Sequence, residues 1–163
     1  MEKTVKSVKK AKLDKIDCKI LSEMQENGRI TNVELARKVG ISAPPCLRRV
    51  RALEEAGYIK GYHAVLDSGM LGFGVTVFAM VRLTSQAEQD LVRFEQHISS
   101  LPMVRECHML AGEVDFLLKI VSEDWESYQE FLKKELTGAP NVTSVKSSLC
   151  IRESKNRPGI PVE

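Results

Sequence analysis

The spacing of apolar residues changes after the first third of the chain. Up to Gly57, apolar positions recur every three or four residues, which predicts helices, and beyond it they often alternate, which predicts strands. The first helix is expected from Leu13 to Asn27, with Asp14 as its N-cap and Gly28 after its end. Its apolar face comprises Ile16, Ile20, Leu21 and Met24.

Residues 31–57 predict two short helices joined by a tight turn. Thr31 and Glu34 have capping-box spacing, and Gly40 follows the first helix, where a left-handed residue is common. Ser42 is a suitable N-cap for the second helix, and its first turn tolerates proline. We expect the first helix to bury Val33, Leu35, Ala36 and Val39, and the second to bury Cys46, Leu47, Val50 and Leu53.

The outer face of the second helix is slim and positively charged. Arg48 points almost directly away from the apolar face, and Arg49 and Arg51 flank it. Such a face fits a DNA major groove, and the whole arrangement is the helix-turn-helix pattern. The alternative is a solvated basic face on an ordinary helical hairpin. The predicted DNA contacts are Ser42, Pro44, Pro45, Arg48, Arg49, Arg51 and Lys60.

A strand is predicted directly after this helix, from Tyr58 to Leu66, because the segment alternates and contains aromatic residues. In that position a strand forms a wing, from which Lys60 could contact a phosphate. Glycines between Asp67 and Gly74 predict a hinge.

The remainder of the chain predicts the order β-α-β-β-α-β. Two helices would cover one face of a four-stranded antiparallel sheet, which is the ferredoxin-like arrangement. The last helix is expected to bury Trp125, Tyr128, Phe131, Leu132 and Leu136. The elements are Val75–Leu83, Gln86–Leu101, Val104–Leu110, Val114–Val121, a helix from Ser122 or Glu123 to Thr137, and Val142–Arg152.

The first of these strands is apolar at odd and even positions alike, including Phe78 and Met80. A strand of this kind is covered on both faces, and the chain is too short to supply both covers. We infer that a partner subunit lies on the face that the helices leave open.

The fold class is therefore α+β, with an N-terminal winged helix-turn-helix domain followed by a ferredoxin-like βαββαβ domain. The predicted parts are a mobile basic arm (1–12), the DNA-binding domain (13–66), the hinge (67–74), a ligand-sensing and oligomerisation domain (75–153) and a loose C-terminal tail (154–163).

Charge is distributed unevenly over the 163 residues, although the net charge is only +2. Residues 1–66 carry 14 Lys and Arg against 8 Asp and Glu, a net of +6, whereas residues 67–163 carry 10 against 14, a net of −4. A basic head on a mildly acidic body suits a nucleic-acid-binding domain joined to a domain with another task.

Cysteine and histidine give no sign of a metal site or a disulfide framework. The four cysteines are scattered without Cys-x-x-Cys spacing, and no histidine groups with them. No apolar run approaches membrane-spanning length, and the first ten residues lack an apolar signal core. We expect a cytoplasmic protein with no metal and no cofactor.

The sequence resembles the Lrp/AsnC family of prokaryotic transcription factors. The resemblance lies in Leu13 to Asp67, including the Cys-Leu-Arg-Arg-Val run from Cys46, and in Val104 to Val121, including the Gly112-x-x-Asp115 turn. It covers nearly all of the chain from Leu13 to Glu153.

The resemblance implies a homodimer that assembles further, to an octamer, and an amino acid or related metabolite bound between dimers near the Gly112–Asp115 turn. The residues it implies for the ligand are Met109, Ala111, Gly112, Glu113, Asp115, Ser148 and Leu149. Turn N–H groups can hold a carboxylate, and Asp115 could meet an ammonium group. The alternative is a tight hairpin in which Asp115 caps its own backbone.

The function predicted is sequence-specific DNA binding in transcription regulation, responsive to an amino-acid effector and not enzymatic. One alternative is a metabolite-sensing oligomeric module without specific DNA binding. The other is a small ferredoxin-like enzyme, for which the sequence offers no nucleophile paired with histidine and no phosphate loop.

Overall fold

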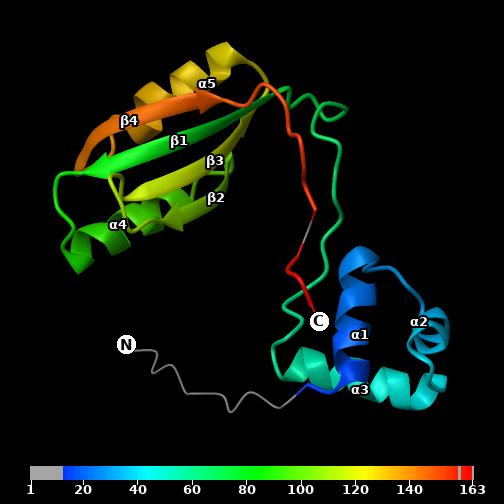
Figure 1. Cartoon of the computed structure of the whole chain (residues 1–163). Helices are drawn as coiled ribbons and strands as arrows, with labels where there is room; N and C mark the ends of the chain where they lie inside the picture. The colour runs from blue at the N-terminus through cyan, green and yellow to red at the C-terminus, as the bar shows by residue number, and fades with distance from the viewer. Residues whose placement is uncertain (1–12, 158, 163) are drawn as a thin grey trace. The chain divides into compact units, whose positions relative to one another are not determined.

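The computed structural model describes residues 13–157 and 159–162 (Figure 1). The predicted arm, residues 1–12, lies outside the described residues. The chain divides into two compact units, of which one holds the described residues up to Val65 together with those from Lys155 onward. The other unit is Leu66–Ser154. We call them the helical unit and the sheet unit.

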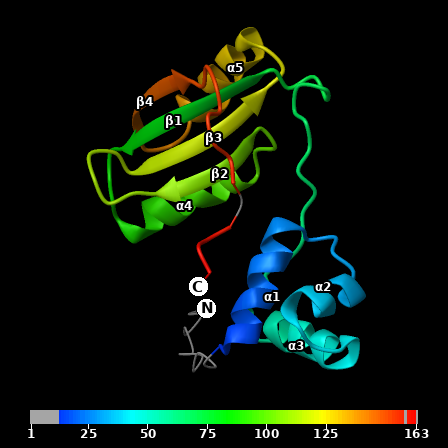
Figure 2. The same ribbon diagram turned by 45° about the vertical axis from the view of Figure 1, so that its right-hand side comes forward.

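The described residues of the helical unit form three helices, α1 (Lys15–Glu26), α2 (Asn32–Val39) and α3 (Ala43–Glu55). Figure 2 shows them packed around a common centre. Ile20 of α1 is fully buried there, against Leu35 of α2 and Cys46 of α3. The other buried members of this core are Ala36, Val39, Val50 and Leu53.

The ends of these helices follow the sequence closely. The Thr31 side chain accepts from the Glu34 N–H, and the Glu34 carboxylate accepts from the Thr31 N–H, which completes the predicted capping box. Gly40 ends α2 with a φ of 81°, a left-handed conformation that favours glycine. Asp14 caps α1 as predicted, and Asp17 completes a second capping box.

The sheet unit has the predicted order β1 (Val75–Leu83), α4 (Glu88–Ser99), β2 (Val104–Met109), β3 (Phe116–Ser122), α5 (Trp125–Phe131) with a π-helical turn (Leu132–Leu136), and β4 (Val142–Leu149). The strands lie in the order β2-β3-β1-β4, and every neighbouring pair is antiparallel. This is the predicted ferredoxin-like arrangement.

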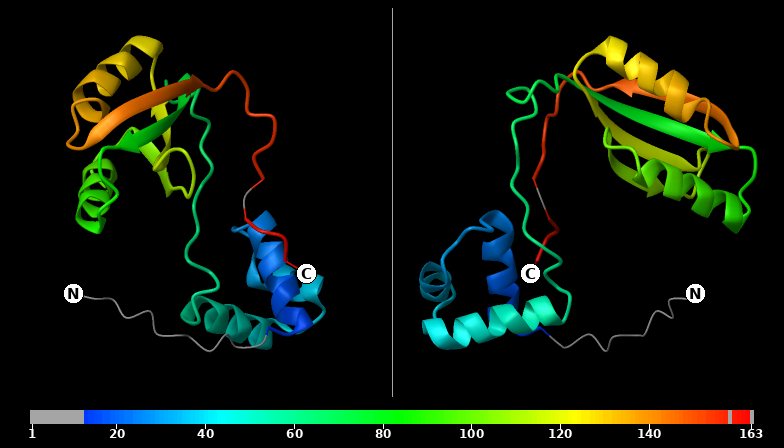
Figure 3. Two further views of the ribbon diagram at one scale, coloured as in Figure 1. Left: turned by 60° about the vertical axis from the view of Figure 1, so that its left-hand side comes forward. Right: turned by 180° about the vertical axis from the view of Figure 1, so that it is seen from behind.

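Both helices of the sheet unit lie on one face of the sheet (Figure 3). The odd positions of β1 from Val77 to Leu83 are buried against them. The tilted rings of Phe94 of α4 and Phe116 of β3 lie with their centroids 4.7 Å apart, and Tyr128 of α5 is fully buried. Helix α5 continues into the π-helical turn, in which Leu136 is fully buried in the same core.

The opposite face of the sheet carries the even positions of β1. Phe78 pairs with Lys119 of β3 and Ser148 of β4, and Met80 pairs with Leu117 and Lys146. Residues paired across strands share a face, so these side chains lie together. Phe78, Met80 and Leu117 are only half-buried, and no described helix covers them. We call this surface the open face.

Several sequence expectations were wrong in detail. Val33 is 69% exposed and Trp125 44% exposed, although both were assigned to buried helix faces. Leu47 is 39% exposed, and the segment from Tyr58 to Leu66 forms no strand. An apolar side chain alone does not decide burial in a short helix, because the packed neighbours fix which face turns inward.

Candidate functional site

The turn between α2 and α3 is fixed by backbone and side-chain hydrogen bonds. The Gly40 and Ile41 N–H groups both donate to the Ala36 carbonyl. The Asn32 side chain, at the start of α2, donates to the Ala43 carbonyl at the start of α3 with an N–O distance of 2.9 Å. These hydrogen bonds therefore fix the angle between α2 and α3.

Helix α3 begins in a way that leaves polar groups facing outward. Ser42 occupies the N-cap position and is exposed, but its side chain makes no capping hydrogen bond. Pro44 and Pro45 lie in the first turn, as predicted, and lack N–H groups of their own. The Ser42 hydroxyl is therefore uncommitted within the described part of the chain.

The outer face of α3 carries two exposed arginines. Arg48 and Arg51 border a shallow hollow of about 440 Å³, together with Pro44, Leu47, Ala52 and Glu55. Within the described residues neither guanidinium forms an ion pair. Two uncommitted cations on a protruding helix can neutralise phosphates or donate to guanine edges.

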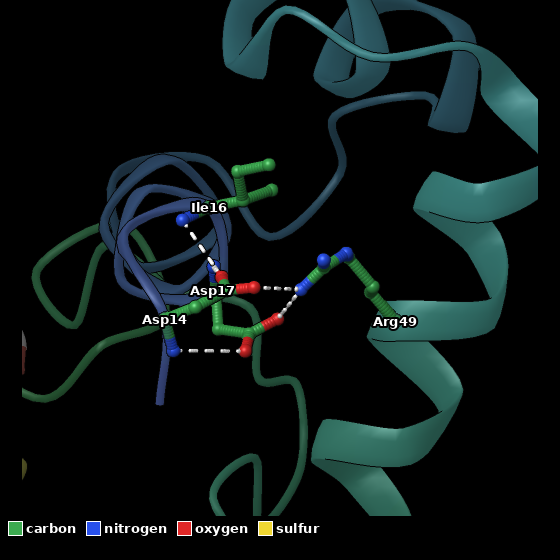
Figure 4. Close-up of polar contacts among 4 residues, drawn as sticks. All are labelled: Asp14, Ile16, Asp17 and Arg49. Carbon is green, nitrogen blue, oxygen red and sulfur yellow. Dashed lines mark hydrogen bonds and ion pairs between the residues drawn. The ribbon is translucent and has the colours of Figure 1, made fainter. Parts of the chain in front are cut away.

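Arg49 has a different environment, as Figure 4 shows. Its Nη1 atom lies 2.7 Å from Asp14 Oδ2 and 2.7 Å from Asp17 Oδ1, at the start of α1. The backbone N–H of Asp17 and this guanidinium lower the pKa of Asp14, while the two carboxylates raise the pKa of Arg49. Arg49 therefore joins α3 to α1, and any contact with DNA must come from its remaining donors.

The segment after α3 is anchored without being a strand. The Tyr58 and Ile59 N–H groups donate to the Leu53 carbonyl. The Tyr62 hydroxyl donates to Glu54 at 2.8 Å, and burial together with this carboxylate raises the pKa of Tyr62 to about 12. Lys60 is exposed, and its contact with a phosphate stays a prediction.

The second candidate site is a hollow of about 410 Å³ in the sheet unit. It is lined by the predicted residues Met109, Ala111, Gly112 and Asp115, and also by Gln86, Leu91 and Leu110. The additional three gave no signal in the sequence, because they line the hollow only through the packing of residues 86–91 against the β2–β3 turn.

Asp115 is buried and already holds the chain around it. Its Oδ2 accepts from the Leu83 N–H at 2.6 Å, and its Oδ1 accepts from the Gln86 side chain at 2.8 Å. Arg82 donates to the Glu113 carbonyl on the same turn. Asp115 thus organises the loops that border the hollow by holding the end of β1 and Gln86, and not by capping the backbone of its own hairpin. A carboxylate has further lone pairs for a ligand.

Gly112 has neither a conformational nor a steric reason to be glycine in this single chain. Its φ is not positive, and a Cβ there would meet no atom within 4 Å. The space next to the Gly112 Cα atom is therefore open in a single chain.

Ser148 and Leu149 lie away from this turn within one chain. They pair with Phe78 and Val77 of β1, whereas the turn enters β3 at Phe116, opposite Val81. Three residues of strand separate Val81 from Phe78, about 10 Å at the usual rise. One chain does not bring the two sets of predicted ligand residues together.

The described residues show no metal site, no disulfide and no membrane-spanning helix. In the range 13–157 and 159–162 no three His, Cys, Asp or Glu side chains gather as a metal site would require. The four cysteines are unpaired thiols. None of the described helices combines the length and apolar character needed to cross a bilayer.

Two family models match successive parts of the chain. Residues 13–60 match the family model described as winged helix-turn-helix DNA-binding, and residues 76–160 match the one described as Lrp/AsnC ligand binding domain.

Named relatives match over nearly their whole length. The chain is 52% identical to the leucine-responsive regulatory protein of Rhizobium meliloti (strain 1021), covering 91% of this chain and 96% of that protein. It is 41% identical to the Bkd operon transcriptional regulator of Pseudomonas aeruginosa, covering 93% and 99%. Among solved structures, the complex of a transcriptional regulator of Neisseria meningitidis with L-Met matches with a TM-score of 0.87 and 36% identity, covering 91% of this chain and 96% of that one.

Proposed function

The chain belongs to the Lrp/AsnC family of transcriptional regulators, and from that premise we propose that its dimer presents two α3 helices to neighbouring half-sites of one operator. Helix-turn-helix dimers read half-sites about one DNA turn, roughly 34 Å, apart. Like its relatives, the chain is a DNA-binding regulator with a ligand-binding domain, and it is not an enzyme.

The observation that carries the proposal is the exposed pair Arg48 and Arg51 on the outer face of α3. Both guanidinium groups are uncommitted within the described residues, whereas Arg49 is held by two carboxylates. We assign Arg48 and Arg51 to direct DNA contact, with Ser42 and the nearby prolines at the helix start and Lys60 on the flanking segment as supporting contacts. Arg49 orients the helix.

The test is to replace Arg48 and Arg51 singly by alanine. Fluorescence anisotropy would measure binding to an operator duplex that the wild-type protein has selected from a random pool, at fixed salt. We expect affinity to fall roughly 10- to 100-fold for an arginine that reads a base, and the salt slope to fall by about one unit for an arginine that contacts a phosphate.

The matched control is Arg93→Ala, which removes the same charge from the sheet unit and leaves α3 intact. Equal affinities for wild type, Arg48→Ala and Arg51→Ala would remove the outer face of α3 from the interface. A wild-type protein that selected no sequence from the pool would instead support a sensing module without specific DNA binding.

For the effector, we propose an amino acid bound in the hollow beside the β2–β3 turn. Support comes from the lining, which combines apolar side chains with the carboxylate of Asp115. A structural relative has been solved with L-Met, and another relative is named leucine-responsive, so these two amino acids are the first to try. Ser148 and Leu149 would come from a neighbouring copy of the chain.

For assembly, we propose that two copies pack their open faces together and that such dimers associate further, to an octamer. Support comes from the half-buried Phe78, Met80 and Leu117, which no described helix covers. We also propose that the protein acts in the cytoplasm, because its proposed partner is DNA.

A further inference from the structure

The last residues of the chain return to the helical unit. Gln25 of α1 donates from Nε2 to the Ile160 carbonyl at 2.8 Å and accepts from the Ile160 N–H at Oε1, with an N–O distance of 2.9 Å. One side-chain amide thus satisfies both backbone groups of one residue, as a neighbouring strand would. The sequence alone led us to expect a loose tail.

A second contact lies one residue further along α1. The Arg157 guanidinium pairs with the Glu26 carboxylate, with Nε 3.1 Å from Oε1 and a shorter contact from Nη2. Gln25 and Glu26 therefore hold the tail at two points, on either side of the glycine at position 159. A terminus held twice by adjacent helix residues has a defined place rather than a random one.

Gly159 is what lets the chain come so close to Gln25. Its φ of 87° lies in the left-handed region. A Cβ at this position would lie 2.0 Å from the Gln25 Cδ atom and 2.1 Å from its Oε1 atom. Any larger residue would have to displace the side-chain amide that binds Ile160.

An apolar groove lies beneath the tail. It has a volume of about 640 Å³, with α1 on one side, the segment Gly57–Tyr62 on another and Ile160, Pro161 and Val162 along the rim. Leu21 and Met24 are the main α1 residues in it. Ile160 itself stays 70% exposed, so the tail covers the groove without filling it.

The tail is also the direct continuation of the sheet. Strand β4 ends at Leu149, and the N–H of Cys150 still donates to the Thr76 carbonyl of β1 at 2.9 Å. Only the residues between Cys150 and Arg157 separate this hydrogen bond of the sheet from the Arg157 contact with α1. The chain therefore connects its two units twice, once through residues 66–74 and once through its C-terminal end.

We propose that the C-terminal residues, of which 155–157 and 159–162 are described, form a strap that docks reversibly on the α1 groove of the same chain. The few exposed polar contacts stabilise the docked state only weakly, and ordering the segment costs conformational entropy. The free energy of docking is therefore small, and the strap detaches easily. Docked, the described residues of the strap are part of the helical unit. The docking does not rest on the proposed function.

Hydrogen–deuterium exchange of the full-length protein, read by mass spectrometry, tests the docking without DNA or effector. We compare wild type with Gly159→Ala, Gln25→Ala and the double variant. In the wild type, the peptide that contains Ile160 should exchange on the order of tenfold more slowly than an unstructured reference. Either single substitution should abolish that protection.

The double variant should exchange no faster than either single variant, because both changes act through the same contact. Arg37→Ala, an exposed change on α2, is the matched control and should keep the protection. A wild-type peptide that exchanges at the unstructured rate would overturn the proposal, as would protection that survives both single substitutions. Arg48→Ala should leave the exchange unchanged, so a failure of DNA binding and a failure of docking are separable.

Discussion

The two units differ in how much of their candidate site a single chain supplies. The outer face of α3 is complete in one copy, because neighbouring turns of one helix present Arg48 and Arg51 together. The hollow beside the β2–β3 turn lacks Ser148 and Leu149, which lie several residues away along the sheet, and the open face lacks a cover. The proposed DNA contacts can therefore be understood from one chain, whereas the proposed ligand site of the sheet unit would need residues of a second copy.

The largest expected effect follows from charging the open face. Met80→Glu would place a carboxylate among half-buried apolar side chains, and burying it in a subunit interface would be very unfavourable. We expect sedimentation to show monomers and operator affinity to fall by about two orders of magnitude or more, since two half-sites would no longer be bound together.

Val92→Glu is the control for that substitution. Val92 is 38% exposed on α4, which lies on the helix-covered side of the sheet. It should leave the oligomer intact. If Met80→Glu also kept the wild-type oligomer size, the open face would not be the subunit interface. The separation of Ser148 and Leu149 from the hollow would then be the remaining difference between the two units.

An intermediate effect is expected for Asp115→Asn. The amide keeps one acceptor oxygen, and its NH₂ group then faces either the Leu83 N–H or the Gln86 side chain. Leaving a buried donor unpaired costs about 1–3 kcal/mol, so thermal unfolding of the sheet unit should shift downward. Calorimetric titration with L-methionine and L-leucine should show weaker binding.

Glu113→Gln removes the same charge from the same turn, where only the backbone carbonyl of Glu113 has a described contact. It should change stability little. Equal loss of amino-acid binding in both variants would mean that the hollow responds to charge in general and not to the Asp115 carboxylate.

The smallest effect concerns the clamp between Arg49, Asp14 and Asp17. If Arg49 only orients α3, then Arg49→Ala and the pair Asp14→Asn with Asp17→Asn should weaken operator binding in the same direction, because either change loosens the same contact. If Arg49 touches DNA directly, removing the two acids should strengthen binding, because negative charge near the phosphates is lost. Anisotropy at fixed salt separates these outcomes.

The clamp also has a predicted pH dependence. The pKa of Asp14 is lowered from its ordinary value of 3.8, so its contribution to stability is fully present above that value. It should be lost as the pH falls below 3.8 through the folded-state pKa. Melting curves of wild type and Asp14→Asn should therefore converge toward acid, and a constant difference at all pH values would contradict the assignment.

Local patterns predicted local structure well. The bounds of β1 agree with the sequence at both ends, the Thr31–Glu34 capping box formed as expected, and the strand order followed from the order of elements. These features depend on residues within a few positions of each other or on a period, and both are visible in sequence.

Features that depend on a distant surface were predicted less well. Relative to the centre of the buried face formed by Cys46, Val50 and Leu53, Leu47 lies about 90° away and Arg49 only about 70° away at the usual turn per residue. The apolar residue is therefore the more exposed one, and the arginine reaches α1. The docking of the tail on Gln25 joins residues 135 positions apart, which no local pattern shows.

The exposed position of Leu47 has a consequence for the choice of bases. An aliphatic side chain beside two guanidinium groups is suited to touch the methyl group of thymine while its neighbours donate to guanine or phosphate. We therefore expect an operator in which uracil replaces thymine to bind more weakly at the positions that Leu47 reaches, and Leu47→Ala to erase that difference. Leu47, which the sequence pattern assigned to the core, would then be the residue that distinguishes thymine from uracil.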